Sequence, residues 1–396
     1  MNKKLLLVLQ CVFLLVGCNG NENSSGLEEE NKDSYQIKIV DIDGEVIGDK
    51  TIKVTEQTNV FDDLVANFEV DYTVSDYGPY ISSINNSVVD ANYYMSIYEN
   101  NAAAATGVDG LVAEVNDVFE FKVECWNTVS SGYGTLDDYD VLVDKVIYGY
   151  MKDLDLSTST TYADSSFWDL MTIKLAKENY YDAKLFSFDN ISGAVKNELP
   201  TVNYSTLNEA GLYKYYLYNK VLGNDLTALK EYAETYSTTI NNYNYYSTPF
   251  AIAAFKGLGI SNDNITRLTN LEISNDFQWG PDIPVWQYCT SLLYNESLDT
   301  STLTKCVETI DYGNSCSNSL TLQAFAATGV NVRESQYEVD GKDLIEVLFD
   351  NYYNKDNNIL EYTQGVINTY SENQTIASLM AYKVFRDTGK KVNIYG

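Results

Sequence analysis

The chain has 396 residues and is acidic, with 26 lysines and arginines against 56 aspartates and glutamates, for a formal net charge of −30. This balance argues against nucleic acid as a partner, because phosphates are held by lysines and arginines that displace counterions. The chain contains no histidine, which excludes a Ser-His-Asp triad and a histidine-bound zinc ion.

Residues 1–17 have the pattern of an export signal. Lys3 and Lys4 precede an apolar run from Leu5 to Val16 that is too short to span a bilayer core of roughly 30 Å. The run ends just before Cys18, and this order resembles a bacterial lipoprotein signal peptide. The resemblance implies cleavage before Cys18, lipid attachment to that cysteine, and anchoring on the extracellular face of the cell membrane. The alternatives are an ordinary secretory signal, or a small cysteine in the core.

Residues 18–34 are predicted to form a flexible tether. They are rich in Asn, Gly, Ser and Glu, and Leu27 is an isolated apolar residue. A segment of this composition buries too little apolar surface to offset its ordering entropy. The length of the remaining chain favours two domains or more.

Residues 35–127 are predicted to form a β-rich domain. Apolar and polar residues alternate from Tyr35 to Ile39, and Asp43-Gly44 is a turn signal before a second strand. Further strands are expected at 93–98 and 118–125. A sheet of this kind packed with one helix forms an α+β module.

The helix of this domain is predicted to follow Asn59, whose side chain can cap it. Asp62-Asp63 in its first turn suits the helix dipole and is expected to be structural. Apolar residues spaced i, i+3, i+4 and i+7 predict one buried face, made of Phe61, Leu64, Val65 and Phe68.

Five segments follow one another in this domain: Val60–Leu64, Gly78–Ile84, Tyr93–Asn100, Gly107-Val108 and Val115–Phe121. Their order and spacing resemble the small β domain of the transcobalamin and intrinsic-factor family. The resemblance covers about 90 residues and lacks a Trp that often begins the strand at Tyr93.

Residues 138–396, after a linker at 128–137, are predicted to form helices in two concentric layers. Pro249–Gly257 and Leu320–Gly329 are small and apolar on nearly all sides, which is typical of helices buried among other helices. The helix predicted near Leu344–Tyr352 is amphipathic instead, with one apolar and one polar face. Asp340 is its expected cap and Asp343 the acidic partner.

A loose internal repeat supports this interpretation. A polar start, a small-residue helix and a glycine stop recur near Tyr246, Cys316 and Asn373, with a fainter copy at Asp164. The spacing of roughly 60–70 residues is enough for a hairpin of two helices in each repeat.

The helical half resembles the α/α toroid shared by transcobalamin-like proteins, prenyltransferases and terpene cyclases. Tyr243–Ala251 is similar to an inner-helix motif of the cobalamin carriers, in which Asn244 matches an amide-binding Asn. Tyr243 replaces the motif's glycine, and Ala253 its later Gln. Gln374 matches a position in the last inner helix of bacterial relatives.

The predicted fold class is therefore multidomain α+β, with a β-rich domain followed by an α/α toroid of antiparallel helical hairpins. This domain order is the reverse of the animal carriers. About 260 residues is short for twelve helices, so one hairpin is expected to be degenerate.

The resemblance implies binding of cobalamin, another corrinoid, or a different planar, amide-rich ligand between the two domains. A neutral site of amides and rings is expected, because buried amides need partners and large rings need flat walls. No cofactor is required, and without histidine a corrinoid would keep its own axial ligands. The residues expected to line the site are Asn244, Tyr246, Trp286, Gln287, Gln374, Asp164 and Tyr80.

Catalysis is not expected. The nearest approach to the acid motif of terpene cyclases is Asp137–Asp140, which we interpret as a solvated turn or helix cap, with a cation site as the alternative. Cys125, Cys289, Cys306 and Cys316 allow three disulfide pairings or none. An alternative function is a surface adhesion or scaffold module that binds protein or glycan through the Tyr-rich surface.

Overall fold

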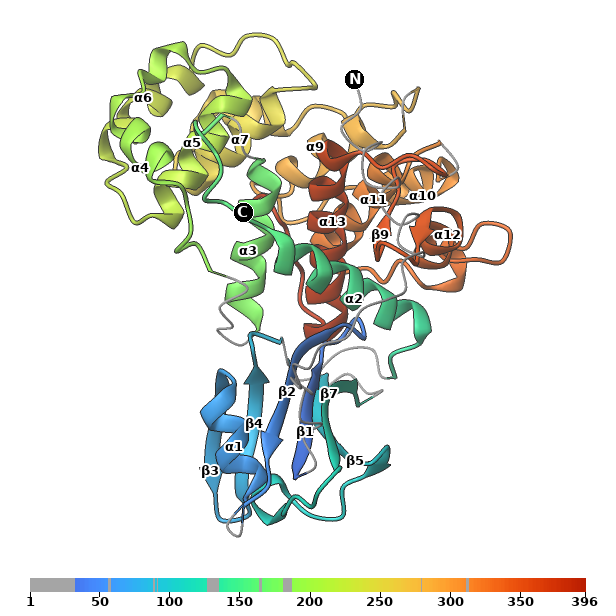
Figure 1. Ribbon diagram of the computed structural model, residues 1–396. Helices are drawn as coiled ribbons and strands as arrows, with labels where there is room; N and C mark the ends of the chain where they lie inside the picture. The colour runs from blue at the N-terminus through green and yellow to red at the C-terminus, as the bar shows by residue number, and fades with distance from the viewer. Residues whose placement is uncertain are drawn as a thin grey trace, which may run out of the picture.

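The computed structural model describes residues 33–55, 58–87, 90, 92–126, 135–163, 166–180, 187–278, 280–310 and 313–396 (Figure 1). The chain has an α+β fold, as the sequence predicts. Strands and one helix come first, in a part that we call the β module (residues 33–126). Twelve further described helices follow, in a part that we call the helical ring (residues 135–396).

The β module is built on a five-stranded sheet. Its strands, in spatial order, are β2 (Val46–Lys53), β1 (Ser34–Val40), β7 (Val118–Cys125), β5 (Tyr93–Glu99) and β6 (Ala102–Ala103). β1 and β7 are parallel, and the other neighbours are antiparallel. A separate hairpin is formed by β3 (Val70–Ser75) and β4 (Gly78–Ile84).

Helix α1 (Val60–Asn67) covers the apolar face of this sheet. Asn59 caps it as predicted, because its side chain accepts the backbone N–H groups of Phe61 and Asp62. The predicted apolar face is wrong at one position. Val65 is 40% exposed, whereas Val60 and Leu64 are fully buried, so the buried face is rotated toward the start of the helix.

The helical ring is an α/α toroid of hairpins. The inner helices are α3 (Phe167–Asn179), α5 (Glu209–Val221), α7 (Thr248–Gly257), α9 (Asp282–Ser291), α11 (Ser315–Thr328) and α13 (Thr369–Thr388). Each packs against the next, and α13 packs against α3, which closes the ring. The helices that alternate with them along the chain are α2 (Asp138–Asp153), α4 (Gly193–Glu198), α6 (Thr227–Ser237), α8 (Asp263–Thr269), α10 (Ser301–Glu308) and α12 (Leu344–Tyr352).

The three strongest repeat units found in the sequence correspond to α7, α11 and α13, all inner helices. In α11 the small residues are buried on every side of the helix. This helix ends at Gly329, which has a φ of 76°. That conformation is costly for residues with a side chain. The shortest of the described helices in the ring is α4, which has only 6 residues.

The N-terminal cap of α12 differs from the predicted one by three residues. Asp343 is the cap, and Glu346 is its reciprocal partner in a capping box. Asp340 instead lies in the preceding turn with φ of 54°. Helix α2 has the same kind of box, made by Asp137 and Asp140, so the Asp137–Asp140 motif is a helix cap.

The last residues of the chain fill the middle of the ring. Tyr395 is 2% exposed and its ring contacts Trp168 and Phe250. Its hydroxyl donates to Gln323 Oε1 at 2.7 Å, and Asn393 Nδ2 donates to the backbone oxygen of Cys289 at 2.7 Å. The segment is therefore part of the ring's core.

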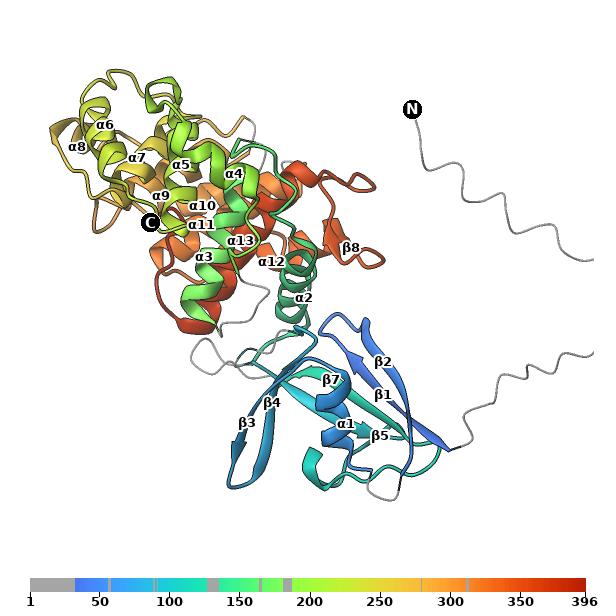
Figure 2. The same cartoon turned by 60° about the vertical axis from the view of Figure 1, so that its left-hand side comes forward.

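The β module packs on the ring at α2 (Figures 1 and 2), and α13 reaches it beside α2 through the pair of Lys383 and Asp90. Ile42, Tyr93 and Val123 of the β module belong to the same apolar cluster as Val143 and Ile147 of α2. The core of the ring is thus continuous with the interface between the two parts.

A buried charge cluster lies at this interface. Lys383 Nζ is 2.9 Å from Asp90 Oδ2, 3.1 Å from Asp144 Oδ1 and 2.9 Å from Asp387 Oδ2. Arg386 Nη2 also binds Asp144, at 2.8 Å. Buried charges of this kind require close partners because desolvation is expensive.

Cys289, Cys306 and Cys316 are buried thiols rather than disulfides. Burial raises the pKa of Cys306 and of Cys316 to about 12, so both are protonated at neutral pH. Cys125 packs at the edge of the main core from β7, as its alternating strand pattern predicts. Within the described part of the chain, none of the helices has the length and apolarity that a membrane crossing requires.

Candidate functional site

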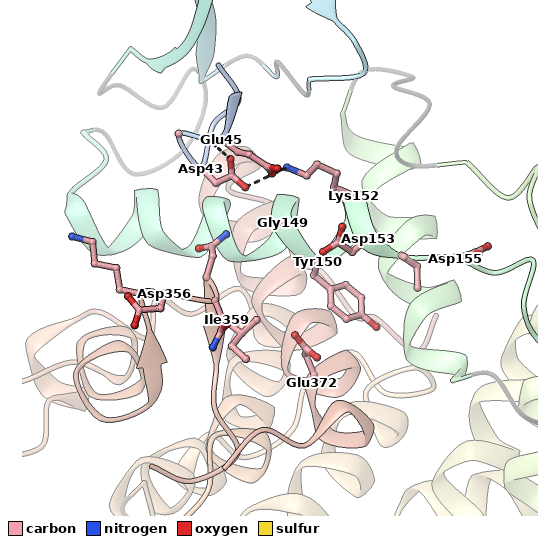
Figure 3. Close-up of a pocket in the computed structure, with 15 residues that line it drawn as sticks. Asp43, Glu45, Gly149, Tyr150, Lys152, Asp153, Asp155, Asp356, Ile359 and Glu372 are labelled. Carbon is pink, nitrogen blue, oxygen red and sulfur yellow. Dashed lines mark hydrogen bonds and ion pairs between the residues drawn. The ribbon is translucent and has the colours of Figure 1, made fainter. Parts of the chain in front are cut away.

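A cavity of about 790 Å³ lies between the β module and the ring, and we call it the junction cleft. Three segments far apart in the sequence form its walls (Figure 3): the β1–β2 turn, the C-terminal end of α2, and the turn between β8 (Tyr353–Asn354) and β9 (Ile359–Leu360). Glu372 of α13 completes the lining.

The β8–β9 turn approaches α2 closely at Gly149. A Cβ atom at that position would lie 2.7 Å from Asn358 Nδ2, which is closer than side-chain atoms tolerate. Asn358 Nδ2 also donates to the backbone oxygen of Lys145 at 2.9 Å. A glycine in α2 therefore lets the turn form one wall of the junction cleft.

Lys152 closes one edge of the junction cleft. Its Nζ lies 2.6 Å from Glu45 Oε2 and 3.4 Å from both Asp41 Oδ2 and Asp43 Oδ2. Burial alone would lower the pKa of Lys152, but the hydrogen bond to Glu45 and the charges of the two aspartates raise it. The ammonium group thus joins α2 to the β1–β2 turn, as Figure 3 shows.

Carboxylates line the interior of the junction cleft, Asp153 and Glu372 among them. Burial and the neighbouring charge of Asp153 raise the pKa of Glu372. Deeper in the ring, burial raises the pKa of Asp169 to about 6, although a hydrogen bond from Tyr150 Oη at 2.7 Å opposes the shift and Glu372 adds to it. The negative potential here favours a ligand with cationic or N–H groups.

A second cavity of about 460 Å³ lies beside the first. The two share Lys152 and Leu154 in their linings. Asn85 and Asn86 of the β module and Asn190 of the ring contribute amide groups to the second cavity. Lys152 therefore stands between an acidic compartment and an amide-lined one.

Two of the predicted site residues come together elsewhere, at the start of the inner helices. Tyr246 and Trp286 line a cavity of about 240 Å³ with Asp282 and Ile283. Tyr246 is 62% exposed, and Trp286 Nε1 is buried without a hydrogen-bond partner in the described structure. Burial raises the pKa of Asp282.

The other predicted residues have local roles or lie apart from the junction cleft. Asn244 Oδ1 accepts the backbone N–H of Tyr246 at 3.0 Å and so shapes the turn before α7. Gln287 is fully buried, and its amide pairs with the backbone of Ser274 at 2.8 Å and of Glu272 at 2.9 Å. It fixes the loop before α9, where both its amide oxygen and its amide nitrogen are engaged.

Gln374 Nε2 is buried and has no hydrogen-bond partner among the described groups. Tyr80 is 53% exposed on β4 and pairs with Thr73 in the β3–β4 hairpin. Neither residue lines the junction cleft. Cys18 and Asp164 lie outside the described residues.

Sequence reasoning did not identify the junction cleft, but one signal pointed to it. Asp153 ends α2 and Asp155 follows shortly after, where the helix dipole disfavours negative charge. Acidic residues at the C-terminal end of a helix lower its stability, and a role in a functional site can explain why they are there. The β1–β2 turn was recognised only as a turn.

Among the described residues, no three cysteine, aspartate or glutamate side chains are placed to hold a metal ion together. No protein-family model matches the sequence, and no curated protein is significantly similar to it. Among solved structures, a Ruminococcus gnavus ATCC 29149 protein described as a "putative metal binding protein" is 17% identical, with a TM-score of 0.22. The match covers 24% of this chain and 97% of that one.

Proposed function

We propose that the chain is a surface-anchored lipoprotein that binds a small molecule in the junction cleft and catalyses no reaction. The observation that carries the proposal is a cavity of about 790 Å³ whose walls come from both the β module and the ring. Cavities of roughly 300–1,000 Å³ between structural units are where proteins commonly hold small ligands.

The lining indicates the class of ligand. Six carboxylates face two lysines in the junction cleft: Asp43, Glu45, Asp153, Asp155, Asp356 and Glu372 against Lys152 and Lys355. Such a wall accepts hydrogen bonds from amide or amine groups and disfavours anions. A corrinoid is the candidate that the family resemblance brings, because its amide side chains offer N–H donors to these carboxylates. Its cobalt would keep its own axial ligands, since the chain has no histidine.

The test is a titration of the full chain, kept in detergent, with cyanocobalamin and cobinamide, followed by calorimetry and by corrin absorption. We expect sub-micromolar binding that Glu372→Gln weakens about tenfold or more, as losing a charged acceptor in a ligand site should. Glu231→Gln is the matched control, because Glu231 is exposed on α6. No binding at about 100 μM would remove corrinoids as the ligand class.

The anchor is tested separately. Cys18→Ser removes the thiol that the signal resemblance assigns to lipid attachment. We expect the wild-type chain to label with radioactive palmitate and to sediment with membranes, and the variant to do neither. A variant that still labels with palmitate would contradict the lipoprotein proposal without touching the binding proposal.

A further inference from the structure

One face of the five-stranded sheet presents aromatic side chains away from the apolar core. β5 and β7 pair so that Tyr94 lies opposite Glu124 and Ser96 opposite Lys122. Side chains alternate along a strand, and the intervening Met95 and Ile97 pack toward the core under α1. Tyr94, Tyr98 and Trp126 therefore lie on the opposite face, and we call them the aromatic platform.

The aromatic platform is exposed at Trp126, while Tyr94 and Tyr98 are half-buried. Tyr94 and Trp126 stack with ring centroids 4.1 Å apart and an interplanar angle of 27°. Trp126 nevertheless remains 52% exposed, an unusual state for the largest apolar side chain. The backbone N–H of Trp126 donates to the backbone oxygen of Asn92 at 2.8 Å. This bond fixes the backbone from which the indole extends.

Polar groups border the platform at fixed positions. Glu124 accepts hydrogen bonds from Tyr94 Oη at 3.2 Å and from Tyr98 Oη at 2.9 Å, through different oxygens. Each carboxylate oxygen keeps a lone pair for a further donor. Lys122 Nζ lies 3.7 Å from the same carboxylate. A flat apolar surface thus stands beside both an acceptor and a donor.

We propose that the aromatic platform binds a neutral oligosaccharide. A sugar ring has an apolar face of C–H groups and an edge of hydroxyl groups. The first stacks on an indole or phenol ring, while the second hydrogen-bonds to groups such as Glu124 and Lys122. The net charge of −30 disfavours anionic glycans by repulsion. The tyrosine and tryptophan rings are rigid, so little conformational entropy is lost on binding.

This site is independent of the junction cleft, so its test does not depend on the proposed function. The full chain, kept in detergent, is titrated with cellohexaose, maltohexaose and chitohexaose while tryptophan fluorescence and heat are recorded. We expect at least one of the three to bind. Trp126→Ala should weaken that binding about tenfold or more, because it removes the exposed stacking surface, whereas Tyr94→Ala should weaken it less, because Tyr94 supports the indole from its other side.

Tyr77→Ala is the matched control, because Tyr77 is 99% exposed in the β3–β4 turn and lies outside the platform. Its affinity should equal that of the wild type. Thermal unfolding of each variant checks that the β module remains folded. We expect it to, because the substituted side chains lie on its surface. Failure of all three oligosaccharides to bind, or equal binding by Trp126→Ala and the wild type, would overturn the proposal.

Discussion

Lys383 and Asp90 form an ion pair of 2.9 Å in which both side chains are essentially inaccessible to solvent. The lysine belongs to α13 in the ring, and the aspartate lies between β4 and β5 in the β module. Two further carboxylates, of Asp144 and Asp387, complete its surroundings. Their charges raise the pKa of Lys383 against the opposing effect of burial. The lysine is thus a charged link between the two parts.

Lys383→Met should strongly destabilise the protein. The substitution leaves three buried carboxylates without one of their cations, and breaking a buried pair in this way costs about 3–5 kcal/mol. Urea unfolding followed by circular dichroism measures the effect. Lys220→Met, at an exposed position of α5, is the control and should change stability by less than about 0.5 kcal/mol. Equal urea midpoints for the two variants would show that the cluster tolerates the loss.

Asp169→Asn should change how stability depends on pH. Burial raises the pKa of Asp169 to about 6 in the folded state, whereas an unfolded aspartate titrates near 4. A raised carboxyl pKa gives stability that is present below the unfolded value and is lost as pH rises through the folded value. The wild type should therefore lose up to about 3 kcal/mol from this group between pH 4 and pH 6.

The Asn variant lacks that titration. Its stability relative to the wild type should rise from pH 4 to pH 7, as measured by urea unfolding at both pH values. The hydrogen bond from Tyr150 has an acceptor in either side chain, so the comparison isolates the charge. A stability difference that stays constant across this range would mean that Asp169 titrates normally.

The two kinds of helix could be predicted because each has a local signal. The small, apolar surfaces of α7 and α11 indicated burial on all sides, and both are inner helices. The cap of α12 was misplaced because Asp340 and Asp343 are equally good capping residues by type. Only the turn at Asp340, with its positive φ, decides between them.

The junction cleft could not be predicted, because its walls meet only after folding. Asp43, Tyr150 and Asp356 come from three separate turns and helix ends. The resemblance directed attention to Tyr246 and Trp286, which do share a cavity. No local pattern could show that the amide of Gln287 hydrogen-bonds to the neighbouring loop.

Tyr395→Ala should destabilise the ring more than Tyr395→Phe. The alanine variant leaves a cavity among Trp168, Phe250 and the other rings around it, at a typical cost of about 3–5 kcal/mol. The phenylalanine variant loses only the hydrogen bond to Gln323, worth about 1 kcal/mol. Differential scanning calorimetry of both variants checks the order. If the two variants have the same melting temperature, the aromatic side chain of Tyr395 does not contribute to the core of the helical ring.

Gln287 and Gln374 offer a matched pair, in which the same substitution should lower the stability at one position and leave it unchanged at the other. Gln287→Leu deprives the part-buried backbone N–H of Ser274 and the carbonyl of Glu272 of their partners, which should cost about 1–2 kcal/mol in urea unfolding. Gln374→Leu removes a buried amide nitrogen that has no partner in the described structure. Its stability should therefore change by less than about 0.5 kcal/mol. A residue that is dispensable for folding yet buried and polar is a candidate for ligand contact. If Gln374→Leu destabilises the chain as much as Gln287→Leu, Gln374 is a structural residue and its assignment to a ligand is wrong.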